Sequence, residues 1–304
     1  FDTLQAVPAD AVFKVNIVSV NSVYERLHRN FIWRSLKNYP YFEEYQSNLQ
    51  YADSLANAYP KLEKILTDRP VTISCHQVGL NKYDFLYVCD LGKLNVIQVF
   101  EALLLGLVQD DEIKIKTIKD LNGEIREVHW GNGRFFFAIR DNLLIGSLSH
   151  ALVARSLARC KASKEEQEEV VSGDIMLDLD HRQLGRWVAS VMEESAVADE
   201  FSLLRNTRLM MQLNDKSLRF VGETRPDPNK YSLLDVVSFL EGGSSNLETI
   251  AGENTAAYVS FCFPSFKDAE NLLLENYKVN RLQSYTEMKK SLDRLNKFLD
   301  MDVL

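Results

Sequence analysis

Three tight-turn motifs at nearly even spacing constrain the fold of this chain more than any other feature. Between Ile113 and Ser149, segments of alternating apolar and polar residues are separated by Asn122-Gly123, Asn132-Gly133 and Asp141-Asn142. Asparagine and glycine tolerate the positive φ angles that hairpin turns require. Alternation is typical of a strand with one buried face. The segment therefore predicts a four-stranded antiparallel meander.

Two further hairpins are predicted on either side of the meander. Val71 to Gln77 and Tyr83 to Leu91 are strand-like and flank a turn. Residues 208–214 and 218–224 show the same pattern around Asp215-Lys216. Amphipathic helical patterns lie between these strands. The expected fold class is therefore α+β, with antiparallel meander sheets and helices packed on one face.

A strand that turns directly into an amphipathic helix recurs along the chain. Val12–Leu27 aligns without a gap with Ala257–Leu272, and Ile175–Val188 resembles a third copy. Such a unit cannot bury its apolar face unless other units pack beside it. The sequence therefore predicts a fold built from repeated strand-helix units, and repetition favours a scaffold over a catalytic role.

The length of 304 residues favours two lobes, because a single core seldom grows beyond this size. The charge-rich stretch 161–173 is the expected connector between a first α+β lobe, residues 1–160, and a second, residues 174–304. Tyr285–Met301 resembles an earlier helical segment, yet no strand follows it. We therefore expect the second lobe to be truncated and the natural protein to continue after Leu304.

The net charge of −8 opposes a phosphate backbone, so nucleic acid is not an expected partner. The most apolar stretch, Val96–Val108, is interrupted by Glu101 and is shorter than the roughly 20 residues of a membrane span. No transmembrane segment is therefore expected in this chain. The start at Phe1, without a charged and then apolar leader, indicates a processed or trimmed chain. A membrane anchor upstream of Phe1 is compatible with it.

The opening LQAVPADAVFKVNI and the later DRPVTISCHQVGLNKYDFLYVCDL resemble the uncharacterised exported bacterial proteins grouped as domain of unknown function 3352. The resemblance covers most of the chain and rests on patterns of proline, alanine and alternating apolar residues. It implies an envelope protein with an N-terminal membrane anchor and an outward-facing soluble part, located in the periplasm or cell envelope. The family has no assigned activity, so the resemblance implies no catalytic residue.

Two residue groups could carry chemistry, and in both we favour a structural role. Asp178, Asp180 and His181 could bind a metal, because side chains two apart on a strand share a face. A half-buried strand shows the same spacing, and no second ligand cluster completes a site. Cys75 and His76 point to opposite faces of a strand, so this histidine cannot easily activate this thiol. We expect no metal, no cofactor and no catalytic residue.

A disulfide between Cys75 and Cys89 is not expected. A hairpin centred near Leu80 places Cys75 opposite Leu86, so the two sulfur atoms are offset along the strands. Cysteine in such apolar runs behaves as a small hydrophobic residue.

One aromatic surface is singled out as a candidate for binding a partner. Tyrosine combines apolar area with a hydroxyl group and is enriched at interfaces. A structural role in the core is the favoured alternative. The members of this tyrosine-rich surface are Tyr39, Tyr41, Phe42, Tyr45, Tyr51 and Tyr59.

The function expected from these patterns is that of a non-catalytic cell-envelope protein that binds a protein partner or an apolar ligand. No phosphate-loop, dinucleotide or serine-hydrolase motif occurs in the sequence. The alternative is an enzyme whose site is assembled from distant residues. A deep pocket with convergent polar groups would favour the enzyme, and a shallow sheet face or an apolar cavity would favour the binding protein.

Overall fold

The computed structural model describes residues 2–36, 69–92, 114–130, 133–162, 173–192, 201, 203–227, 266–280 and 282–301. The chain divides into two compact units, Phe1–Arg225 and Pro226–Leu304. The tyrosine-rich surface and the apolar stretch Val96–Val108 lie outside the described residues. The division into lobes at residues 161–173 stays a prediction.

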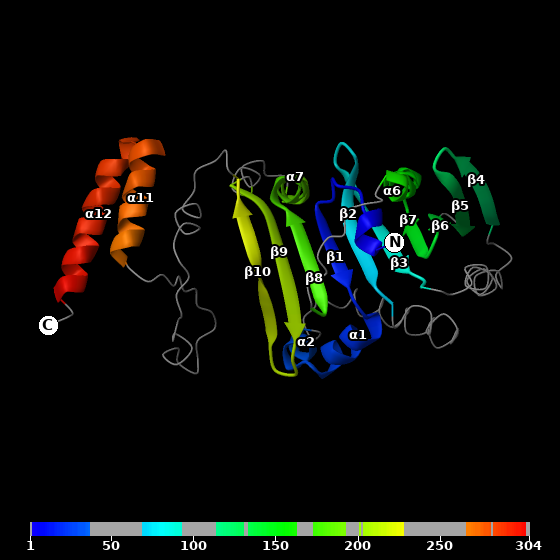
Figure 1. Cartoon of the computed structure of the whole chain (residues 1–304), viewed down its shortest axis with the longest axis horizontal. Helices are drawn as coiled ribbons and strands as arrows, with labels where there is room; N and C mark the ends of the chain where they lie inside the picture. The colour runs from blue at the N-terminus through cyan, green and yellow to red at the C-terminus, as the bar shows by residue number, and fades with distance from the viewer. Residues whose placement is uncertain are drawn as a thin grey trace. The chain divides into compact units, whose positions relative to one another are not determined.

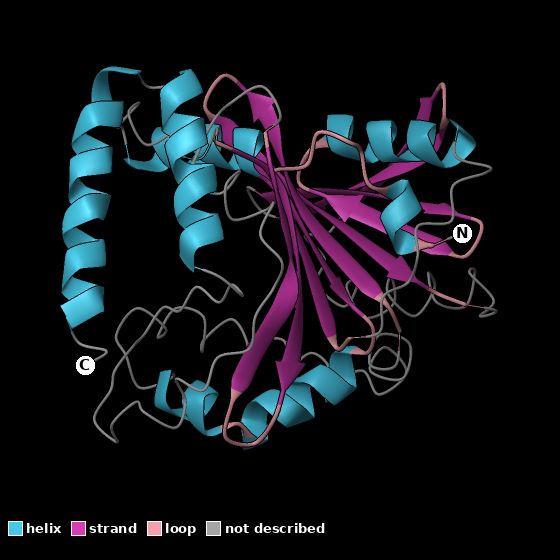
Figure 2. Cartoon of the chain, turned by 60° about the vertical axis from the view of Figure 1, so that its left-hand side comes forward, coloured by secondary structure: helices cyan, strands magenta, loops and turns pink. Residues whose placement is uncertain are grey.

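The first unit is built on one ten-stranded antiparallel sheet in the order β10-β9-β8-β1-β2-β3-β7-β6-β5-β4 (Figure 1). Its strands twist and fan out across the unit (Figure 2), as the handedness of L-amino acids requires. The strands are β1 (Phe13–Ile17), β2 (Val71–Gly79), β3 (Lys82–Asp90), β4 (Lys114–Asp120), β5 (Gly123–Trp130), β6 (Gly133–Arg140), β7 (Leu143–Ser147), β8 (Ile175–Asp180), β9 (Leu204–Leu213) and β10 (Leu218–Pro226).

The helices of the described residues fall into both units. The first unit contains η1 (Thr3–Ala6), α1 (Val20–Arg29), α2 (Phe31–Leu36), α6 (His150–Ala162) and α7 (His181–Met192). The second unit contains α11 (Phe266–Asn280) and α12 (Leu282–Met301), which pack against each other; the Asn296 amide donates to the Glu270 carboxylate at 2.8 Å. Within the described ranges, none of the helices has the length and apolar character to cross a membrane.

The predicted meander is confirmed as β4-β5-β6-β7. The first turn is made by Leu121-Asn122, one residue earlier than expected, because Asp120 pairs with Gly123. The Asp120 carboxylate accepts the N–H of Asn122 at 3.0 Å, which stabilises this turn. In the third turn Asp141 has a φ of 52°, the conformation that its residue type tolerates.

The two other predicted hairpins are confirmed as β2-β3 and β9-β10. The predicted register of β2-β3 is wrong by one residue: Cys75 lies opposite Phe85 and not Leu86. A bulge between Gln77 and Gly79 causes the shift, because it adds one residue to β2. Cys75 and Cys89 are both free thiols, as expected, since Cys89 lies opposite Val71.

Helices cover both faces of the sheet, so the expectation of helices on one face is wrong. Val88 packs with η1 and α6 in the larger core cluster, whereas Val15 packs with α1 in the second cluster. Val88 pairs with Thr72, and Thr72 with Asn16, so Val88 shares a face with Asn16 and not with its neighbour Val15.

Two of the three predicted strand-to-helix transitions are confirmed, and the strand part of the third, residues 257–265, lies outside the described residues. β1 leads into α1, where the Ser19 hydroxyl accepts the N–H of Ser22 at 3.2 Å. β8 leads into α7, where the Asp180 carboxylate accepts the N–H groups of Arg182 and Gln183, both at 3.0 Å. These side chains satisfy N–H groups that have no partner inside the helix.

Candidate functional site

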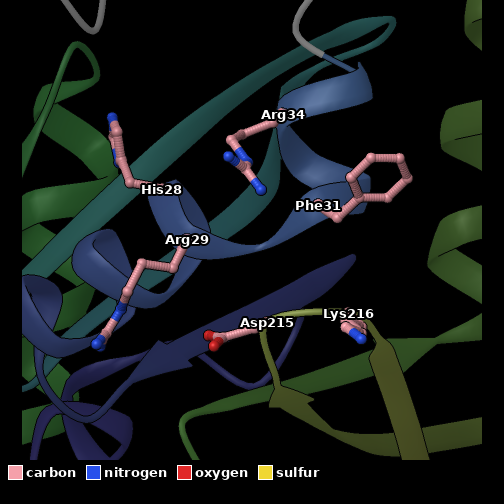
Figure 3. A pocket seen from close by; sticks show the side chains of 6 residues that line it. All are labelled: His28, Arg29, Phe31, Arg34, Asp215 and Lys216. Atoms are coloured by element: carbon pink, nitrogen blue, oxygen red, sulfur yellow. The ribbon is translucent and has the colours of Figure 1, made fainter.

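A pocket of about 660 Å³ lies where the α1–α2 corner meets the β9–β10 turn (Figure 3). Arg29, Phe31 and Arg34 come from the helical corner, and Asp215 and Lys216 come from the turn that faces it. All the lining residues are exposed, so the pocket is an open depression in the surface. We call it the cationic pocket; its members are His28, Arg29, Phe31, Arg34, Asp215 and Lys216.

Asn30 fixes the geometry of this pocket. Its side chain is fully buried, and its amide group donates to the carbonyl oxygens of Asn214 and, at 3.1 Å, Ser217. Its side-chain oxygen accepts the N–H of Trp33 at 2.9 Å and so caps α2. The N–H of Phe31 donates to the carbonyl oxygen of Asp215 at 2.7 Å. The helical corner and the turn are therefore held together by backbone groups and one amide side chain.

The pocket carries an excess of positive charge. Among the described residues, Arg29, Arg34 and Lys216 form no ion pair, and Asp215 is the single carboxylate in the lining. Nearby Arg26, by contrast, is neutralised by Asp174 at 2.6 Å. A depression lined by one sign of charge focuses the field and attracts opposite charge. The pocket therefore suits an anionic group.

Next to this charge the pocket offers an apolar surface. The ring of Phe31 is 61% exposed although it lies at the first position of α2. The His28 ring lies 4.0 Å from that of Tyr24, centroid to centroid, and its Nδ1 donates to the Tyr24 carbonyl oxygen at 3.0 Å. The arrangement can bind a group that is partly anionic and partly apolar.

A second cluster, the polar row, joins the fully buried Ser74 and His76 to the exposed Asp10 and Arg155. The Ser74 hydroxyl lies 2.9 Å from His76 Nε2, and His76 Nδ1 lies 3.3 Å from the Asp10 carboxylate. That carboxylate also accepts from Arg155 of α6. An ionised carboxylate only accepts, so Nδ1 carries the proton and Nε2 accepts from the serine hydroxyl. This is the hydrogen-bond order of a serine-hydrolase triad.

Burial argues against catalysis in this row. The side chains of Ser74 and His76 are fully buried, so no substrate carbonyl can reach the hydroxyl oxygen. Burial lowers the pKa of His76 against the opposing charge and hydrogen bond of Asp10, so the ring is neutral. Burial alone would raise the pKa of Asp10, but the hydrogen bond and charge of Arg155, together with His76, lower it. The row joins β2 to the N-terminal segment and to α6.

Because His76 is buried in its neutral form, we expect the protein to lose stability as the pH falls. Its pKa in the folded state lies below the unfolded value of 6.5, so below about pH 6.5 the unfolded chain binds a proton that the folded chain excludes. Burial lowers the pKa of His181 in the same way. We expect the free energy of unfolding to fall as the pH is lowered through about 6.5, by at most about 1.4 kcal/mol per pH unit for each histidine.

Urea titrations at several pH values measure this dependence. His76→Gln removes one titrating group and keeps an amide that can donate to Asp10, so the variant should show a smaller slope of stability against pH. An unchanged slope in His76→Gln would assign the whole effect to other groups and contradict the role given to His76.

Cys75 is not activated by its neighbour His76. Cys75 pairs with Phe13 and Phe85 on the other face of β2 from the polar row. Burial, together with the charge of Asp84, raises the pKa of the Cys75 thiol to about 11. The thiol is therefore protonated at neutral pH and lacks the thiolate that a nucleophile needs.

The three residues considered as metal ligands are occupied by structural contacts. Asp178 accepts from Arg208 in a bidentate pair at 2.7 and 3.2 Å, and Asp180 caps α7. His181 is buried, and its Nε2 lies 2.6 Å from the hydroxyl of Thr207. Across the described ranges, no group of three or more His, Cys, Asp or Glu side chains could hold a metal ion.

An aromatic strip crosses the sheet face opposite to η1 and α6. Ring centroids are separated by 6.1 Å from Trp187 to Phe13, 6.2 Å from Phe13 to Phe85 and 6.5 Å from Phe85 to Tyr87. Phe85 and Tyr87 are 40% and 43% exposed. The strip is a partly covered apolar surface.

The chain matches no protein-family model, no curated protein and no solved structure. The family resemblance and the location that it implies therefore remain expectations.

Proposed function

We propose that this chain is a non-catalytic binding protein of the cell envelope, and that its cationic pocket receives an acidic segment of a protein partner. The observation that carries the proposal is the cluster of Arg29, Arg34 and Lys216, which form no ion pair among the described residues of a chain with a net charge of −8. The location rests on the family resemblance alone.

An acidic peptide segment fits the chemistry of the pocket. Arginine binds a carboxylate through two parallel hydrogen bonds, so Arg29 and Arg34 can each orient one acidic side chain. An apolar side chain of the same segment can pack on the exposed ring of Phe31. The lining residues are all exposed, which suits a macromolecular surface more than an enclosed small-molecule site.

A peptide-binding experiment tests the proposal. The probe is a fluorescent peptide rich in glutamate with one leucine, and binding is followed by fluorescence anisotropy. We expect Arg29→Glu/Arg34→Glu to raise the dissociation constant of the peptide by roughly tenfold or more, because two cations become anions. The matched control is Arg186→Glu/Arg205→Glu, which changes two exposed arginines elsewhere and gives the same net charge. Equal weakening in both variants would show that net charge alone attracts the peptide and would contradict a site.

The alternative, an enzyme with a site assembled from distant residues, is supported by the order of hydrogen bonds in the polar row. We place it second because Ser74 and His76 are fully buried. Covalent modification of Ser74 by an organophosphonate would reverse this ranking.

An apolar ligand, the other class expected from the sequence, would be held by the aromatic strip. Phe85 and Tyr87 provide its exposed part, and Trp187 at the other end reports on binding. Quenching of Trp187 fluorescence by a fatty acid would favour this ligand class over an acidic segment.

We infer that the ten-stranded sheet contains two copies of one repeat, which consists of a strand, a helix and a hairpin. In the first, β1 and α1 are followed by the hairpin β2-β3; in the second, β8 and α7 are followed by the hairpin β9-β10. Each hairpin lies beside the first strand of its own copy, and these two strands, β1 and β8, pair antiparallel. This arrangement supports the repeat predicted from Val12–Leu27 and Ile175–Val188. A circular permutant whose chain begins at β8, the start of the second copy, and still folds would support the repeat further.

A further inference from the structure

β10 is an outer strand of the sheet, and within the described ranges no strand pairs with its free side. Residues 219–225 are all exposed, and Phe220 and Val221 are 54% and 39% exposed. An exposed edge strand presents a row of N–H and C=O groups on which another strand can pair.

The hairpin geometry determines which groups point outward. The N–H of Asn214 donates to the carbonyl oxygen of Ser217 at 3.1 Å, and the hydroxyl groups of Thr207 and Thr224 lie 2.9 Å apart. Both pairs fit the same register of β10 against β9. In that register the residues at 218, 220, 222 and 224 direct their N–H and C=O groups away from β9. Arg219, Val221 and Glu223 have side chains on the opposite face from these residues.

We propose that two copies of this chain pair through β10, antiparallel, about a two-fold axis at Val221. Val221 then lies opposite the partner's Val221, and Phe220 lies opposite the partner's Gly222. Arg219 lies opposite the partner's Glu223, and this pair occurs twice because the interface is isologous. The outward N–H and C=O groups of Phe220 and Gly222 form the intermolecular hydrogen bonds.

Charge complementarity selects this register. Moving the axis one residue to Gly222 places Arg219 opposite the partner's Arg225, so two repulsive pairs replace two attractive ones. Glu223 and Arg225 already form an exposed ion pair at 2.8 Å within one copy. Pairing at Val221 adds Arg219 of the other copy to Glu223. Charges on an edge strand discourage pairing with unrelated strands. Here Arg219 and Glu223 favour pairing with β10 of a second copy.

Shape complementarity supports the same register. Phe220 has an exposed ring, and the residue that it would face has no side chain. A related packing occurs inside the sheet, where Gly146 lies opposite Phe137 and the ring of the diagonal neighbour Phe135 covers it, so that an added Cβ would be 2.9 Å from the Phe135 Cε1 atom. A phenylalanine ring over a cross-strand glycine is therefore a packing that this sheet already uses.

A charge-swap series on the full chain, studied by sedimentation velocity across a range of protein concentrations, tests the proposal. The wild type should show a concentration-dependent dimer. Arg219→Glu and Glu223→Arg should each raise the dissociation constant about tenfold or more, because each creates two like-charge pairs. The double variant R219E/E223R should restore the dimer. A wild type that stays monomeric, or a double variant as weak as the single ones, would overturn the proposal.

A cysteine pair tests the register separately. Val221→Cys places two thiols at a directly opposed position without hydrogen bonds, where Cα atoms are about 4.5 Å apart. This variant should form a disulfide-linked dimer under mild oxidation. Glu223→Cys, on the same strand but off the axis, should not. Equal crosslinking of both variants, or of the wild type, would exclude an ordered pairing at Val221.

Discussion

Replacing Asn30 with alanine should lower the free energy of unfolding by about 3 kcal/mol or more, measured by urea denaturation. The Asn30 side chain is fully buried and makes three hydrogen bonds, two of them to the carbonyl oxygens of Asn214 and Ser217. Alanine leaves the Asn214 carbonyl oxygen without its Asn30 donor, at about 1–3 kcal/mol. The Ser217 carbonyl oxygen loses one of two donors and keeps the N–H of Asn214, so its loss is about 1 kcal/mol. It also removes the cap of α2, which is worth about 1 kcal/mol.

Two variants separate these contributions. Asn30→Ser keeps a capping oxygen for Trp33 but cannot replace both donated bonds, so we expect an intermediate loss. Ser19→Ala removes only the cap of α1, which is less buried, and should cost about 1 kcal/mol. If Asn30→Ala costs no more than Ser19→Ala, the bonds to the β9–β10 turn do not stabilise the protein.

Replacing Gly222 with alanine is the second substitution for which we expect a large loss, about 1–3 kcal/mol in the same urea titration. A Cβ at this position would overlap the carbonyl oxygen of Arg208 and lie 2.9 Å from Cα of Leu209. Both are backbone atoms of the adjacent strand, so they cannot turn aside as a flexible side chain can. The β9–β10 hairpin has to separate locally to admit the methyl group.

Gly79→Ala is the matched control, because Gly79 also belongs to a hairpin strand. A Cβ there would make ordinary contact with the Lys82 side chain, at 3.5 Å or more. We expect a change within about 1 kcal/mol, since alanine restricts the unfolded chain and meets no backbone atom. Similar losses in both variants would mean that glycine flexibility, and not the close approach to β9, explains the result.

The parts of the fold that depend on neighbouring residues could be predicted from the sequence. The meander and the two other hairpins follow from turn residues such as Asp141-Asn142 and from alternation on each side of them. The strand-to-helix transitions at Ser19 and Asp180 follow from capping residues at the start of an amphipathic pattern. In each case the chemistry lies within a few residues.

Features that depend on distant residues could not be predicted in this way. The one-residue bulge near Gly79 changes which side chains face Cys75, and no residue type marks it in advance. Coverage of both sheet faces depends on where α1 and α6 pack, which alternation within a strand does not specify. The cationic pocket joins segments held by Asn30 and Ser217, 187 residues apart. Its arginines show no spacing in the sequence that distinguishes them from other surface charges.

The position of β1 in the middle of the sheet affects how the protein folds. Phe13 pairs with Cys75 on one side and with Leu179 on the other, so β1, the first of the described strands, gains its second neighbour only after β8 has been synthesised. Pairings of such high contact order close slowly, whereas β4 to β7 can form from local contacts alone. A nascent chain that has not yet reached β8 therefore leaves one side of β1 open. Refolding should show an early phase from the meander and a slow phase that reports the closure of β1 against β8.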